Sequence, residues 1–232
     1  MIFFIMIIAA ILPAILLWYN IYRKDQKPEP KRLLIKAVLY GVLISLPIIV
    51  AEDTMSFLLL DSETENTTLI EAVVDAFFVT ALPEEGFKLL ALWLIVRKNP
   101  FFDEHFDGIV YAVCVGLGFA GLENLMYIFG ETDGWAEVAL MRALMSVPGH
   151  YVFAVLMGYY YSVYHFINHS FHNKMMIIGA PVLAHGIYDA LLMISGDDVF
   201  LILSCFVICI IFCFKIHKIA NKKIKKLLDE AS

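Results

Sequence analysis

The sequence predicts an all-α membrane protein, a polytopic bundle of transmembrane helices. Of its 232 residues, 61% are hydrophobic and 17% charged, with a mean hydropathy of +0.78. Soluble domains carry about 45–50% apolar and about 25% charged residues. The apolar residues also fall into runs near the roughly 20 residues that cross a bilayer. A third observation is that lysine and arginine gather in alternate loops. Little of the chain is therefore expected outside the membrane.

About seven spans are predicted along the chain. The first lacks the basic n-region of a cleavable signal peptide, and its positive charges follow it, so it is interpreted as an anchor. Only the turn "SGDD" separates the last two spans. The predicted spans cover residues 2–22, 33–51, 70–96, 109–130, 139–165, 176–195 and 199–216.

The placement of basic residues predicts the topology. Of the 17 lysines and arginines, 15 lie at 23–36, at 97–98, at 174 or from 215 onward. The opposite loops, "DSETENTT", "GETDGWAE" and "SGDD", contain acids and no bases. The positive-inside rule then places the N-terminus outside and the C-terminus inside. Residues 1–216 are expected to form one transmembrane domain. Residues 217–232 are expected to form a basic cytoplasmic tail attracted to anionic lipid, and no nucleic-acid partner is expected.

The third span contains charges that a bilayer disfavours. It reads "ALPEEGFKLLALWLIV", and a charged side chain at the bilayer centre costs at least roughly 2.5–3.5 kcal/mol. Glu84 and Glu85 can each reach Lys88, at i+4 and i+3. One carboxylate is expected to pair with the ammonium while the other, about 100° around the helix, points elsewhere. Pro83 is expected to kink the span. A structural ion pair that braces two helices is the alternative interpretation.

Three later spans carry further polar groups. "GFAGLENLMY" contains Glu123, "SVPGHYVFAV" contains His150, and "LAHGIYDALL" places His185 and Asp189 four residues apart on one face. We expect these groups to meet the acidic pair in one cavity. Lys88 and Arg142 are the two basic residues that break the charge rule, and Arg142 is interpreted as snorkelling to the outer interface.

Carboxylates and imidazoles of this kind suit hydrolysis by an activated water. A carboxylate can activate the water while histidines stabilise an oxyanion or hold a metal. No serine or cysteine lies in a recognisable nucleophile motif, and H-E-x-x-H is absent from the sequence. The expected cofactor is therefore either none or Zn²⁺ (or another divalent metal), held by His150, His185 and Glu123.

The segment "GLGFAG" matches the dinucleotide fingerprint G-x-G-x-x-G. That fingerprint requires a preceding strand and a helix that begins at the glycines. Gly116, Gly118 and Gly121 instead lie inside a predicted span, where small residues let helices approach closely. Close helix packing is the better interpretation.

Taken in order, "PEEGFK", "FAGLEN", "PGHYVFAVLMGYY" and "HGIYD" resemble motifs of the PrsW intramembrane proteases, relatives of the type II CAAX prenyl endopeptidases. The resemblance covers nearly the whole chain. It implies a protease of the bacterial plasma membrane that makes the first, site-1 cut in a single-span anti-sigma factor. It also implies roles for single residues: Glu84 as the water-activating base, Glu85 as its partner and Lys88 as the group that tunes both. The remaining site residues implied are Glu123, His150, His185 and Asp189.

The sequence departs from the CAAX relatives at two points. Those proteins have a histidine where this chain has Glu123, and E-E-x-x-x-R where it has E-E-x-x-K. Metal-dependent and glutamate-only chemistry both stay open. Two other classes of function also stay open, a proton-coupled transporter or channel and a non-catalytic scaffold that binds membrane helices. No pairing of repeats between the two halves, as transporters commonly have, is visible in the sequence.

Overall fold

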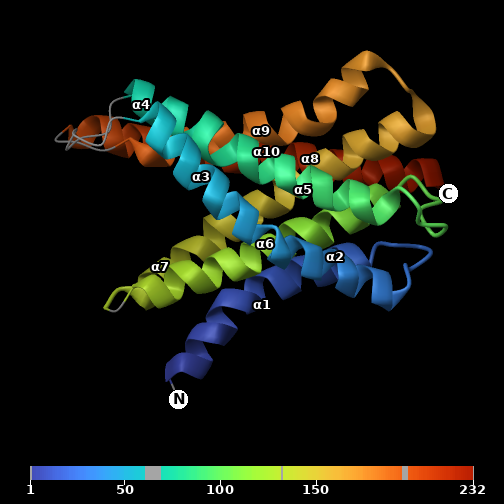
Figure 1. Ribbon diagram of the computed structural model, residues 1–232, viewed down its shortest axis with the longest axis horizontal. Helices are drawn as coiled ribbons and strands as arrows, with labels where there is room; N and C mark the ends of the chain where they lie inside the picture. The colour runs from blue at the N-terminus through green and yellow to red at the C-terminus, as the bar shows by residue number, and fades with distance from the viewer. Residues whose placement is uncertain (1, 61–68, 132, 195–197, 232) are drawn as a thin grey trace.

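The computed structural model describes residues 2–60, 69–131, 133–194 and 198–231, and every regular element in these ranges is helical (Figure 1). The predicted all-α class is confirmed. The α-helices are α1 (Ile2–Tyr22), α2 (Lys31–Leu43), α3 (Ser45–Leu59), α4 (Leu69–Val74), α5 (Leu82–Val96), α6 (Asp107–Gly130), α7 (Trp135–Met141), α8 (Val147–Ser162), α9 (Phe171–Met193) and α10 (Val199–Ala231). Three π-helical segments are η1 (Asp75–Ala81), η2 (Arg142–Ser146) and η3 (Val163–Ile167).

Six helical segments of the described chain are long and apolar enough to cross a membrane. The second of them, Lys31–Leu59, joins α2 to α3 and extends beyond the predicted end at residue 51. The expected span at 70–96 is not among the six, although helix runs from Leu69 to Val96 through α4, η1 and α5. This segment carries the charges of the acidic pair. Together with the six it makes the seven segments that the sequence predicts.

The connections lie at two ends of the bundle. The loop that follows α1, the loop that follows α5 and the C-terminus share one end, and the turn between α6 and α7 lies at the other (Figure 1). This arrangement agrees with the alternation of basic and acidic loops. The orientation in the bilayer, N-terminus outside, stays a prediction.

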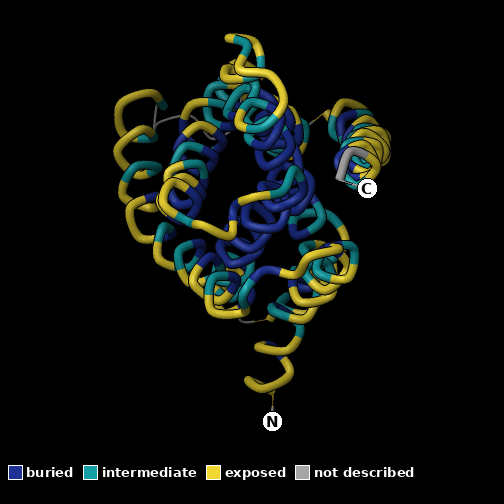
Figure 2. Tube along the Cα trace, turned by 90° about the vertical axis from the view of Figure 1, so that its right-hand side faces the viewer, coloured by how far each residue is buried: buried dark blue, intermediate teal, exposed yellow. Residues whose placement is uncertain are grey.

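Helix α6 forms the centre of the bundle. In the most apolar stretch of α6, 78% of the residues are buried, compared with 17% for α1 and 11% for α10. Figure 2 shows buried residues along the middle of the bundle and exposed residues on its outer faces. Many of the exposed residues are large and apolar, such as Phe57 and Phe200. Outer faces of this kind suit contact with lipid, because lipid chains are as apolar as leucine.

Glycines let α2 and α8 approach the backbone of α6. A Cβ at Gly118 would overlap the carbonyl oxygen of Val38 in α2, and one at Gly116 would lie 2.8 Å from the Cβ of Ala154 in α8. The expected close packing is confirmed at these two positions. At Gly121 a Cβ would meet nothing within 4 Å, so the prediction is wrong for this third glycine.

A buried acid, Glu29, links the loop after α1 to α6 at the end of the bundle that carries the C-terminus. Glu29, in the loop after α1, accepts a hydrogen bond from the hydroxyl of Tyr111, which itself accepts one from the Asn99 amide at 2.8 Å. Burial raises the pKa of Glu29 to about 6. At the same end, α10 continues without a break to Ala231, and Ala220 and Leu227 are buried against the main core. The expected division of the chain at residue 217 stays a prediction.

Substituting alanine for Gly118 tests the packing of α2 on α6. We expect the free energy of unfolding to fall by about 1–3 kcal/mol, because the new methyl group forces two backbones apart. Gly121→Ala is the matched control, since it makes the same chemical change on the same helix in open space. Unfolding in mixed micelles would measure both variants. Equal stability of the two would contradict the packing argument.

Candidate active site

Three prolines precede the polar residues of the site. Pro83 stands in the first turn of α5, directly after η1, and Pro148 stands in the first turn of α8, directly after η2. A proline lacks an N–H and its ring crowds the carbonyl four residues before it, and a π-helical turn relieves this conflict. Pro181 lies inside α9, one turn before His185. The expected distortion at Pro83 therefore takes the form of a π-helical turn, and the same device recurs before His150.

The ammonium of Lys88 lies at the centre of the site. Its Nζ is 2.7 Å from Glu84 Oε2, 2.8 Å from Glu85 Oε1 and 3.3 Å from His150 Nδ1. It also lies 4.3 Å from the ring centroid of Phe119. The two glutamates and the lysine are at most 3% exposed. The prediction that only one carboxylate pairs with the lysine is wrong, because a lysine carries three donors and reaches both acids from one turn away.

His150 connects the lysine to the fourth predicted span. An ammonium can only donate, so His150 Nδ1 accepts from Lys88 and the ring carries its proton on Nε2. That nitrogen lies 2.8 Å from Glu123 Oε2. His150 is therefore held between a cation from α5 and a carboxylate from α6.

His185 is held between two carboxylates. Its Nδ1 donates to Glu85 Oε1 at 3.1 Å, and its Nε2 lies 3.0 Å from Asp189 Oδ2, close enough for an ion pair but without hydrogen-bond alignment. The ring stacks on Phe153, with centroids 4.6 Å apart. The rings of His150 and His185 lie 5.3 Å apart at their centroids. The structure thus brings together all seven residues that the sequence singled out.

Arg142 points into the bundle. Its Nη2 lies 2.7 Å from Glu123 Oε2, and its Nε donates to Asn124 Oδ1 at 2.6 Å. Asn124 in turn donates to the carbonyl of Ala10 in α1. The expectation that Arg142 snorkels to the interface is wrong, because a carboxylate and an amide one residue apart on α6 provide partners inside the protein.

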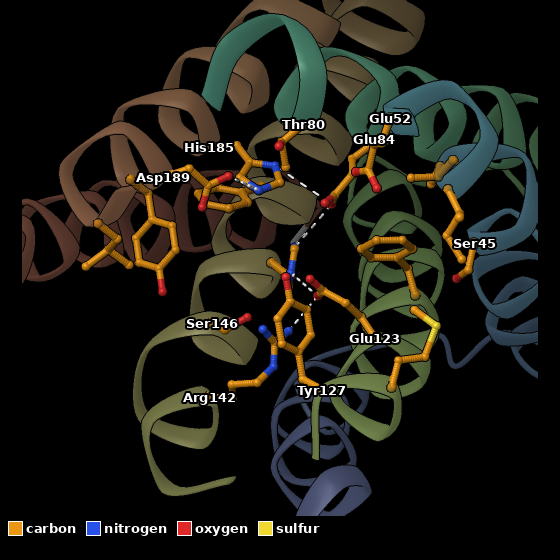
Figure 3. A pocket seen from close by; sticks show the side chains of 18 of the residues that line it. Ser45, Glu52, Thr80, Glu84, Glu123, Tyr127, Arg142, Ser146, His185 and Asp189 are labelled. Carbon is orange, nitrogen blue, oxygen red and sulfur yellow. Dashed lines mark hydrogen bonds and ion pairs between the residues drawn. The ribbon is translucent and has the colours of Figure 1, made fainter. Parts of the chain in front are cut away.

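A cavity of about 460 Å³ opens beside these groups. Glu84, Glu123, His150, His185 and Asp189 line it, and Figure 3 shows several of them around one space. Glu85 and Lys88 are absent from the lining, so they lie behind Glu84. Only one member of the acidic pair is therefore placed to meet a water molecule or a substrate in the cavity.

Four donors in the site could hold a metal ion. One ligand atom each from Glu84, Glu85, His150 and His185 lies within 4.8 Å of the others, and all four residues are buried. Glu123, which the sequence suggested as a ligand, is not in this group, because it meets His150 at the ring nitrogen opposite Lys88. The donor types suit Zn²⁺. The Lys88 ammonium, however, already bonds three of the four donors, so an ion would compete with it for the same atoms.

Two charged residues of the lining, Glu52 and Arg142, were not predicted as part of the site. Glu52 of α3 lines the cavity, but the predicted span ends one residue before it, and the sequence pattern did not single it out. Arg142 was noticed, but its inward direction was not. The signal for Glu52 was available, because an apolar run from Phe57 to Leu60 follows it and indicates that the span continues.

The fold and the site define a class of protein, a helical membrane protein with a buried centre of acids and imidazoles that opens into a cavity. Residues 29–215 match the family described as PrsW family intramembrane metalloprotease. The chain belongs to this family. It is therefore an intramembrane protease, and a multi-pass protein of a bacterial membrane.

Curated relatives of similar length agree with this membership. The chain is 35% identical to the protease PrsW of Clostridioides difficile over 228 residues, which cover 96% of this chain and 91% of the relative. It is 37% identical to that of Oceanobacillus iheyensis, with 79% and 81% covered, and 35% identical to that of Bacillus subtilis, with 82% and 83% covered. No solved structure matches the chain.

Replacing Lys88 by methionine tests its place at the centre of the site. We expect a loss of roughly 3–5 kcal/mol in the free energy of unfolding, because two buried carboxylates lose their cation. The double variant Lys88→Met/Glu85→Gln should recover part of this loss, since it buries one charge fewer. Unfolding of the two single variants and the double variant in detergent gives the coupling free energy. Strictly additive effects would contradict the shared ion pair.

Proposed function

We propose that the protein hydrolyses a peptide bond in a single-span membrane protein by means of a water molecule activated by Glu84. The observation that carries this proposal is the position of Glu84 at the cavity wall with Glu85 and Lys88 directly behind it. The buried ammonium of Lys88 fixes the direction of this carboxylate at the cavity wall, as a general base requires. It then takes a proton from the water as the oxygen attacks the scissile carbonyl.

The histidines supply the second requirement of amide hydrolysis, which is to stabilise the negative oxygen of the tetrahedral intermediate. His185 lines the cavity, and its ring is fixed on one side by Glu85 and on the other by Asp189. In this proposal the Nε2–H of His185, which is not aligned for a hydrogen bond to Asp189, donates to the oxyanion. Glu123 and Arg142 keep His150 in place, and Glu84 returns its proton to the leaving amine.

A metal ion would add Lewis-acid chemistry to the same residues. Bound by Glu84, Glu85, His150 and His185, it would polarise the scissile carbonyl and make bound water more acidic. The protein already has a cation beside these donors, the Lys88 ammonium, and both Glu84 and Glu85 are paired with it. This pairing favours the mechanism in which Glu84 acts without a metal.

The proposed substrate is an anti-sigma factor with one membrane span, cut near its outer end as a site-1 event. This part of the proposal rests on the family resemblance. The cavity is consistent with a peptide substrate, because its lining combines polar groups from α5, α6, α8 and α9 with apolar residues such as Ile48 and Leu192.

Substituting glutamine for Glu84 should lower cleavage by roughly 10²–10⁴-fold, the usual contribution of a general base. A co-expressed single-span reporter, or a peptide cleaved by the purified protein in liposomes, provides the measurement. Glu131→Gln is the control, because it makes the same change at an exposed position. Thermal unfolding should show that Glu84→Gln is still folded. Cleavage at the wild-type rate by a folded Glu84→Gln would remove the proposed mechanism.

Metal content and chelation test the two forms of the chemistry. We expect purified active protein to contain far less than one metal ion per chain by elemental mass spectrometry, and its cleavage to survive a strong chelator. The physical reason is that an ion would have to displace the buried ammonium of Lys88. Near-stoichiometric zinc, together with loss of cleavage on chelation and recovery on adding zinc, would instead establish the metal-dependent form.

A further inference from the structure

Glu52 of α3 is an acid of the cavity that the proposed mechanism does not use. It is half-buried and lines the cavity together with Ser45, Ile48 and Ile49 of the same helix. Figure 3 shows its side chain beside that of Glu84, so the two acids face the same part of the space. Glu52 reaches this space from a different side of the bundle than the residues of α8 and α9.

The other acids of the cavity wall have partners, and Glu52 has none among the described residues. Glu84 is 2.7 Å from Lys88, Glu123 is 2.7 Å from Arg142, and Asp189 is 3.0 Å from His185. The structure gives no hydrogen bond or ion pair to the Glu52 carboxylate within the ranges that it describes. Glu52 is thus the acid of the cavity wall that has no hydrogen-bond or ion-pair partner within the part of the chain that the structure describes.

The position of Glu52 along α3 argues against a simple surface role. It lies seven positions before Leu59, the end of the helix, which is roughly 10 Å at about 1.5 Å per residue. That stretch contains Phe57, which is 86% exposed on the outer face of the bundle. A carboxylate at this depth is costly unless it has a partner or a function. Its neighbour Asp53 is exposed and does not line the cavity.

We propose that Glu52 determines substrate specificity by binding a basic side chain of the substrate, a lysine or arginine one or two residues from the scissile bond. The inference rests on the proposed function, since it assumes that a peptide lies beside Glu84. An acid next to the attacking group, with no cation of its own, is the natural partner for a substrate cation that leaves water. Arginine and lysine stems are also long enough to cross part of a wide cavity.

The experiment uses the full chain in liposomes and a set of membrane-spanning peptides. The cut in a peptide with alanine at the flanking positions is first located by mass spectrometry. Lysine, alanine or glutamate is then placed at each position within two residues of the cut. We expect wild-type protein to favour a lysine peptide over its alanine counterpart in kcat/KM by roughly 10- to 100-fold, the usual range for a hydrogen-bonded charge.

Variants of Glu52 decide the outcome. Glu52→Gln should remove most of the lysine-to-alanine preference, and Glu52→Lys should reverse it in favour of the glutamate peptide. Asp53→Asn is the matched control on the same helix and should leave the preference unchanged. An equal loss of kcat on all peptides in Glu52→Gln would overturn the proposal in favour of a chemical role. A preference that no Glu52 variant alters would overturn it as well.

A binding measurement separates this inference from the proposed function. Glu84→Gln protein should bind the lysine peptide more tightly than the alanine peptide, and Glu84→Gln/Glu52→Gln should not. Such binding with no cleavage by wild-type protein would leave the Glu52 site standing while removing the hydrolytic proposal. Equal binding of the two peptides by Glu84→Gln would overturn the Glu52 site whatever the cleavage assay gives.

Discussion

One buried ammonium, bonded to three side chains from two helices, organises the centre of this protein. Lys88 pairs with Glu84 and Glu85 of its own helix and donates to His150 of α8. None of these charges could stay in a bilayer alone, because removing one partner from a buried pair costs several kcal/mol. The cation therefore has two consequences at once. It makes the burial of two adjacent acids tolerable, and it fixes the direction of the carboxylate that faces the cavity.

From this centre the polar contacts continue to the edge of the bundle. His150 contacts Glu123, and Glu123 forms an ion pair with Arg142. Arg142 donates a hydrogen bond to Asn124, and the Asn124 amide donates one to a backbone carbonyl of α1. Such a chain holds the helices in a defined rotation, since each group would be left unsatisfied if a helix turned. Gly116 of α6 supports this chain, because it lets α8, which carries His150, lie close against the central helix.

Helix α3 stands apart from this network. It adds one acid, Glu52, to the cavity wall without joining the pairs that hold the other acids. In the mechanism that we propose, the paired groups of α5, α6, α8 and α9 carry out the hydrolysis, and the unpaired carboxyl group of Glu52 on α3 binds the substrate. Glu85 and Lys88 do not line the cavity, so their proposed role is to hold Glu84 in place.

The sequence by itself determined the helical class, nearly all of the spans and the seven residues that meet in the site. It could do so because hydrophobicity over about 20 residues and charges inside an apolar run are local properties. Pairs within one helix, Glu84 with Lys88 and His185 with Asp189, followed from spacing alone. Tertiary structure decided that Lys88 binds both acids and His150, that Arg142 turns inward, and that Glu52 lies inside a span. These contacts depend on the rotation and depth of one helix against another, and packing between helices fixes both after the local pattern has been satisfied.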